Sequence, residues 1–173
     1  MWGHSMGGRI TLRAMVVSGE IKAGVMWAGA YRENLERWLR SDRTPTPGPT
    51  PTPDPTLTPD PRSSRRRWLQ EMLDMYGSPE ENPAFWRSIS PNAFLADLSG
   101  PVQLHHGTAD TTVPVEHSET LYAQIQQAGV PVELYSYEGD NHNISNSFGT
   151  AMQRSIQFFD RHVKGIDVAA TGE

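Results

Sequence analysis

The stretch Gly3-His4-Ser5-Met6-Gly7-Gly8, near the start of the chain, decides how the rest of the sequence is interpreted. It satisfies the pattern G-x-S-x-G, in which small residues flanking a serine let the backbone turn sharply where a helix begins. Such a turn holds the serine in a strained conformation and exposes its Oγ. A backbone N–H at the helix start can donate to an oxyanion. The candidate residues are therefore the nucleophile Ser5, the turn residues Gly3 and Gly7, and the oxyanion donor Met6.

Two later segments supply an acid and a base in the order that a hydrolase requires. Asp110 follows a strand predicted over 101–106, and His142 follows one predicted over 132–137. Each would lie in a loop beyond the carboxyl end of a strand, where sites assemble in open α/β sheets. Nucleophile, acid and histidine in this order are typical of α/β hydrolases. Asp140 is the alternative acid. Because it lies only two residues before His142, it is expected to shape the loop that carries His142 instead.

The hydrophobic pattern favours an α/β fold with a parallel sheet. A continuous apolar run over 24–29 is typical of a strand buried on both faces, and the strands at 101–106 and 132–137 alternate with helices. Leu121 and Ile125 are expected to point inward from a helix over 115–128. Two further helices are expected to show apolar faces, formed by Met6, Ile10, Ala14 and Val17 on the first and by Phe148, Met152, Ile156, Phe159 and Val163 on the last.

One segment cannot contribute to a core. Residues 44–61 contain eight of the 14 prolines together with six threonines, which predicts an extended, solvated Pro/Thr-rich linker inserted in the domain. A helix is expected over 31–40 before this linker. Another is expected over 64–76 after it, and the helical region 64–98 resembles a lid.

Composition and charge exclude several classes of protein. The formal net charge of -5 argues against a nucleic-acid binder that works by bulk charge, and the absence of cysteine excludes disulfide, iron–sulfur and thiolate–zinc sites. Neither a signal peptide nor an apolar stretch of membrane-spanning length is visible. His105 and His106 are adjacent on a strand and would face opposite ways, so a metal site is not expected there.

The motifs resemble those of a known family. GHSMGG over 3–8, HHGTADTTVP over 105–114 and GDNHN over 139–143 are similar to the prolyl oligopeptidase family of serine peptidases, which has the α/β-hydrolase fold. The similarity extends over 2–34 and 92–164. It implies that residues 1–173 are the C-terminal part of a catalytic domain, with about three strands and flanking helices. Ser5, Asp110 and His142 would form a triad that needs no cofactor, with a peptide substrate or, alternatively, an ester.

The resemblance also implies structural elements outside the three motifs. Family members have strands before the serine turn and a loop that supplies a second oxyanion donor. Without those strands, the run over 24–29 is expected to expose an apolar edge through Val25, Met26 and Trp27, which favours self-association or pairing with a missing N-terminal portion. A truncated, catalytically inactive fragment therefore stays an alternative to an active hydrolase.

Overall fold

The structure is a computed structural model that describes residues 1–29 and 61–166. These residues belong to two compact units. The first contains residues 1–29 and 91–166, and the second contains residues 61–90. The helix expected over 31–40 lies outside the described residues, and so does the linker expected over 44–61 except for Pro61, which begins a helix instead.

The first unit is organised by a parallel four-stranded sheet. Its strands are β1 (Trp2–His4), β2 (Gly24–Trp27), β3 (Val102–Gly107) and β4 (Val132–Tyr137), in that spatial order. Every pairing is parallel, and β3 and β4 are in register from Val102↔Val132 to Gly107↔Tyr137. The predicted parallel α/β fold is confirmed, but the estimate of about three strands is wrong because the residues just before Ser5 form a fourth.

The pairing of β2 with β1 also shows that the exposed apolar edge expected over 24–29 is wrong. Trp2 pairs with Val25 and His4 pairs with Trp27, so β2 has a neighbour on both sides. The side chains of Val25, Met26 and Trp27 are at most 1% exposed. The run over 24–29 is therefore an internal strand, and in the described sheet the edge beside it is β1.

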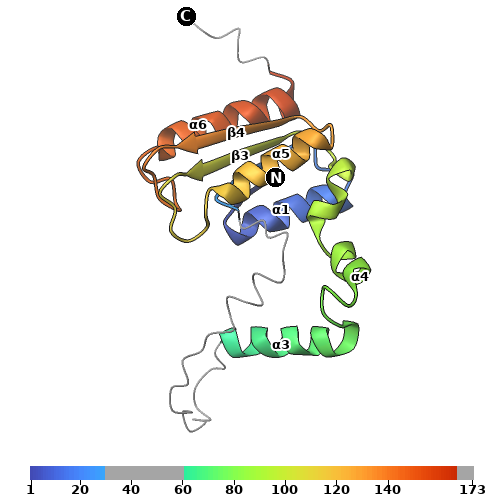
Figure 1. Cartoon of the computed structure of the whole chain (residues 1–173). Helices are drawn as coiled ribbons and strands as arrows, with labels where there is room; N and C mark the ends of the chain where they lie inside the picture. Colours follow the sequence, from blue (N-terminus) through green and yellow to red (C-terminus); the bar gives the residue numbers. More distant parts are fainter. Residues whose placement is uncertain (30–60, 167–173) are drawn as a thin grey trace, which may run out of the picture. The chain divides into compact units, whose positions relative to one another are not determined.

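Helices cover both faces of this sheet (Figure 1). On one face α1 (Met6–Val17) and α5 (Glu116–Gln127) share a buried cluster with Met26 and Leu104, and Leu121 and Ile125 point into it as predicted. The short helix η1 (Pro91–Asp97) adds Leu95 to this cluster. On the other face α6 (Phe148–Phe159), followed by η2 (Asp160–Lys164), packs against Val25, Trp27 and Tyr137.

The inward faces of α1 and α6 differ from the expected ones. α1 buries Gly8, Thr11, Leu12 and Met15, whereas the predicted face carries the exposed side chains of Met6, Ile10 and Val17. α6 buries Ala151, Ser155 and Phe158, whereas Phe148, Ile156 and Val163 are exposed. Polar residues share these inward faces with the larger Leu12, Met15 and Phe158. Ser155 is accommodated there because its Oγ accepts a hydrogen bond from Trp27 Nε1–H at 3.1 Å.

The second unit, within its described residues, contains α3 (Pro61–Tyr76) and α4 (Pro83–Ser88). The side chain of Asn82 caps α4 by accepting a hydrogen bond from Phe85 N–H. The rings of Tyr76 and Phe85 stack with their centroids 3.9 Å apart, and Trp86 Nε1–H donates to Gly77 O. α3 begins at Pro61, three residues before the expected start. Among the described helices, none combines the length and the apolar character that crossing a bilayer would demand.

A buried polar layer lies between the sheet and α6. His105 Nδ1 is 2.8 Å from Tyr137 Oη, and its Nε2 is 2.7 Å from Gln103 Oε1. Burial, assisted by the positive charge of Arg154, lowers the pKa of His105 from 6.5 to about 3. The folded protein therefore holds His105 neutral over a range in which the unfolded chain binds a proton.

This difference makes stability depend on pH. Because the pKa is lowered in the folded state, the contribution of His105 is complete above pH 6.5 and is lost as the pH falls toward about 3. The expected slope is about 1.4 kcal/mol per pH unit in the free energy of unfolding. Urea titrations between pH 6.5 and 4 measure it. His105→Asn is expected to remove this slope, and equal slopes in the two proteins would contradict the assignment to His105.

Candidate active site

Ser5 lies at the junction between β1 and α1. Its N–H donates to Trp27 O at 2.8 Å, and its carbonyl accepts from Gly8 N–H at 3.0 Å, so hydrogen bonds hold the backbone on both sides of the turn. Its φ is 55° and its ψ is -117°, a conformation that non-glycine residues rarely adopt. The strained strand-to-helix turn expected of G-x-S-x-G is thus present at Ser5.

Strain is concentrated at the carboxyl edge of the sheet. Ser5, Ala28 and Ile144 are the non-glycine residues with positive φ in the described part of the chain; Ser5 and Ala28 directly follow β1 and β2, and Ile144 lies in the loop between β4 and α6. Strained backbone persists only where the surrounding structure holds it in place, and it is often found at functional sites. This edge is therefore where a functional site is most expected.

The surroundings of the two glycines of the turn, Gly3 and Gly7, differ in how much room they leave for a side chain. A Cβ on Gly3 would lie 2.2 Å from Gly7 O, because β1 packs directly against the first turn of α1. A Cβ on Gly7 would meet no atom within 4 Å among the described residues. The described structure therefore explains the glycine at position 3 and not the one at position 7. Met6 opens α1, where the first N–H groups have no acceptor within the helix.

Asp110 lies in the loop after β3 and is almost completely surrounded by donors. Its Oδ1 accepts hydrogen bonds from the N–H groups of Thr112 and Val113 at 2.8 and 2.9 Å. Its Oδ2 lies 2.7 Å from His142 Nδ1. Burial by itself would raise the pKa of Asp110, but the hydrogen bonds from Val113, His142 and Thr112 outweigh it and lower the pKa below its ordinary value. The side chain is therefore a carboxylate.

His142 lies in the loop after β4, and Asp140 organises that loop. The carboxylate of Asp140 accepts hydrogen bonds from the N–H groups of Asn141, Asn146 and Ser147 at 3.0, 3.1 and 2.8 Å. Burial would raise the pKa of Asp140, but these bonds lower it overall. Asp140 therefore shapes the turn between β4 and α6, while Asp110 is the acid that contacts the imidazole of His142.

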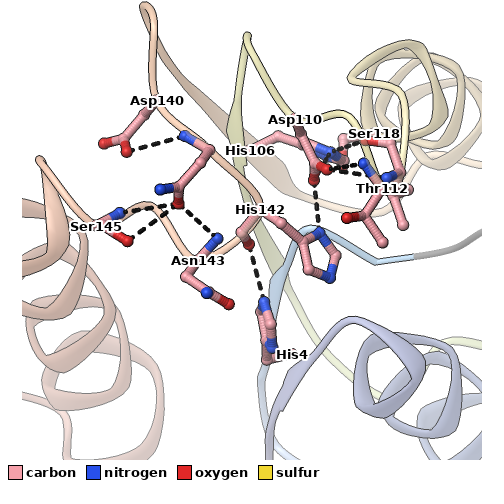
Figure 2. A network of polar contacts seen from close by, with 11 residues as sticks. His4, His106, Asp110, Thr112, Ser118, Asp140, His142, Asn143 and Ser145 are labelled. Atoms are coloured by element: carbon pink, nitrogen blue, oxygen red, sulfur yellow. Dashed lines mark hydrogen bonds and ion pairs between the residues drawn. The ribbon is translucent and has the colours of Figure 1, made fainter.

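His4 joins the serine turn to the His142 loop (Figure 2). Its Nε2–H donates to His142 O at 2.9 Å, and the two imidazole rings lie with their centroids 4.8 Å apart. Asp110 is thus hydrogen-bonded to His142, and the residue before Ser5 contacts the loop that carries His142. In the described part of the chain the Ser5 side chain forms no direct hydrogen bond with His142.

The histidine pair on β3 takes the two faces that strand alternation predicts. His105 contacts Tyr137 and Gln103 on the α6 side, and His106 contacts Asp110 and Ser118 on the other. The contact of His106 with the candidate acid was not anticipated. The spacing of four residues between them, across the end of a strand, is the signal that could have indicated it. Among the described residues no cluster of three or more His, Cys, Asp or Glu is arranged to hold a metal ion.

Comparison with solved structures identifies the fold. The chain is similar to a Pyrococcus horikoshii acylaminoacyl peptidase (24% identity, TM-score 0.61, 98% of this chain and 25% of that one). It is also similar to a Porphyromonas gingivalis dipeptidyl peptidase 4 (21%, 0.63, 94% and 19%) and a Mycobacterium tuberculosis puromycin-hydrolyzing peptidase (20%, 0.61, 94% and 21%). The fold is that of the α/β hydrolases.

The sequence itself defines the family. Residues 57–165 match the prolyl oligopeptidase family, and the chain belongs to it. The matched region contains Asp110 and His142, whereas Ser5 precedes it. No curated protein matches the chain. The chain spans between 19% and 25% of the length of these three solved relatives.

Proposed function

We propose that this chain carries the catalytic triad of a serine peptidase. The observation that supports the proposal best is the hydrogen bond of 2.7 Å between Asp110 Oδ2 and His142 Nδ1, formed at the same edge of the sheet as the strained turn of Ser5. An ionised acid that accepts from Nδ1 keeps the proton on that nitrogen. Nε2 of His142 is then left with its lone pair, as a general base requires.

The proposed reaction proceeds through an acyl-enzyme. Ser5 Oγ attacks the carbonyl carbon of a peptide bond while His142 Nε2 accepts the hydroxyl proton, and the same proton passes to the leaving amine. Water then hydrolyses the ester on Ser5 by the reverse sequence of proton transfers. Asp110 stabilises the imidazolium that forms between these steps. The N–H of Met6 donates to the oxyanion, and no cofactor takes part in this scheme.

Labelling by a fluorophosphonate probe tests the nucleophile. We expect the chain to be labelled and Ser5→Ala to abolish the labelling, because the probe reacts only with an activated serine. Ser18→Ala is the matched control, since Ser18 lies at the other end of α1, and it is expected to label like the unchanged chain. Equal labelling of Ser5→Ala and the unchanged chain would contradict the proposal. No labelling of either would favour the inactive fragment.

A carboxylic ester hydrolase is the second candidate, because the same triad acts on esters. Membership in a family of peptidases favours the peptidase. Incubation of the chain with an aminoacyl p-nitroanilide and a short p-nitrophenyl ester distinguishes the two. Cleavage of the ester without any cleavage of the amide would favour the ester hydrolase.

A further inference from the structure

Asp110 is held by a second histidine besides His142. His106, on β3, places its Nε2 3.1 Å from Asp110 Oδ2, the same oxygen that lies 2.7 Å from His142 Nδ1. Both the His106 and the Asp110 side chains are 0% exposed. Figure 2 shows the two imidazoles converging on this carboxylate from different elements of the fold. The triad geometry proposed above does not require His106.

The neighbours of His106 determine which of its nitrogens carries the proton. Nε2 lies 3.1 Å from Asp110 Oδ2 and 2.9 Å from Val113 O, and both atoms are acceptors. Nε2 must therefore be a donor. Nδ1 lies 2.7 Å from Ser118 Oγ, whose hydroxyl can donate to it. In the neutral ring these contacts assign the proton to Nε2, with Ser118 holding the other side of the ring.

His106 completes the set of donors around the acid. A carboxylate has about four acceptor sites. Asp110 fills two on Oδ1 with the N–H groups of Thr112 and Val113, and two on Oδ2 with His142 and His106. With one site of Oδ2 occupied by His106, the other remains for His142 alone. The position of the carboxylate, and with it the direction of the His142 ring, is thereby constrained from inside the protein.

We propose that His106 is a positioning residue that acts through Asp110 to align His142. This inference rests on the proposed function, since it assigns His142 as the base. Removal of the His106 donor frees the Oδ2 side of the carboxylate to rotate. A misplacement of a reacting group by about 1 Å can cost roughly a hundredfold in rate. His106 would thus contribute to rate and not only to stability.

Three substitutions separate positioning from packing. The amide of His106→Asn is too short to reach Asp110, whereas the amide nitrogen of His106→Gln lies close to the place of Nε2. His105→Asn is the matched control, because it also removes a fully buried histidine from β3 but on the face that does not contact Asp110. We expect His106→Asn to lower the rate constant for fluorophosphonate labelling roughly a hundredfold and His106→Gln to restore most of it. His105→Asn should label at the unchanged rate once corrected for the folded fraction.

A proton resonance reports the alignment without any need for activity. The His142 Nδ1–H, observed by NMR in protein labelled with 15N-histidine, should shift upfield in His106→Asn, return in His106→Gln and stay in place in His105→Asn. An unmoved resonance in folded His106→Asn, or an equal loss of labelling rate in His106→Asn and His105→Asn, would overturn the inference. If His106→Asn does not fold, His106→Leu replaces it, because it also removes the donor to Asp110, and an unmoved resonance there overturns the inference equally. Labelling that does not depend on Ser5 would instead refute the proposed function and leave this NMR comparison valid.

Discussion

Asp110→Asn is expected to lower the rate constant for labelling of Ser5 by about four orders of magnitude. The amide oxygen can still accept from Thr112 and Val113, so its nitrogen must face His142 Nδ1 and His106 Nε2. The amide N–H of the new side chain and the Nδ1–H of His142 are both donors, so they cannot form a hydrogen bond with each other. The least costly solution moves the His142 proton to Nε2, which removes the lone pair that would accept the proton of Ser5.

Two further asparagine substitutions make this result specific. Asp97→Asn changes an exposed acid in the same unit and should leave the labelling rate unchanged. Asp140→Asn removes a loop carboxylate that accepts from Asn141, Asn146 and Ser147, so its main effect should be on the stability of the loop. The assignment of Asp110 as the acid would be wrong if Asp140→Asn abolished labelling while Asp110→Asn, shown to be folded by circular dichroism, retained it.

Gly107→Ala is expected to destabilise the fold and to separate the two loops of the candidate site. A Cβ on Gly107 would lie 2.3 Å from Asp140 O and 2.5 Å from Asn141 O, and both are backbone atoms of the His142 loop. The two loops are also joined by the hydrogen bond from Ala109 N–H to Asp140 O at 2.9 Å. We therefore expect a loss of about 3 kcal/mol in the free energy of unfolding, since overpacking against fixed atoms costs that much.

Urea denaturation and fluorophosphonate labelling measure the two consequences of Gly107→Ala separately. Without urea, where Gly107→Ala is folded, its labelling should still be slow, because the loop that carries His142 is displaced from Asp110. Gly149→Ala is the control, since Gly149 lies in α6 and a Cβ there meets nothing within 4 Å. That variant should be as stable as the unchanged protein, or more stable by up to about 1 kcal/mol because alanine favours helix. Stability of Gly107→Ala equal to that of Gly149→Ala would contradict the close approach.

The class of fold and the candidate residues could be predicted because they depend on local patterns. Ser5 follows from the residues on either side of it, and Asp110 and His142 follow from their place just after two predicted strands. Parallel strands end at one edge of a sheet, so residues that are far apart in sequence are brought to that edge by topology alone. The order of motifs along the chain therefore predicts one site for the three residues, and the structure shows the contact between Asp110 and His142.

The sequence by itself predicted the parallel α/β class and the order of the candidate residues, because these depend on hydrophobic pattern and spacing along the chain, and its motifs carry the resemblance to the family. Only the tertiary structure decided that residues 2–4 form a strand, since three residues become a strand by pairing with β2. It also decided that α1 turns Thr11 and Leu12 inward, because β1 lies so close to α1 that a Cβ on Gly3 would meet Gly7 and Thr11. The contact of His106 with Asp110 likewise required the structure. Hydrogen bonds depend on the direction of donors in space, and that direction is set when the elements pack.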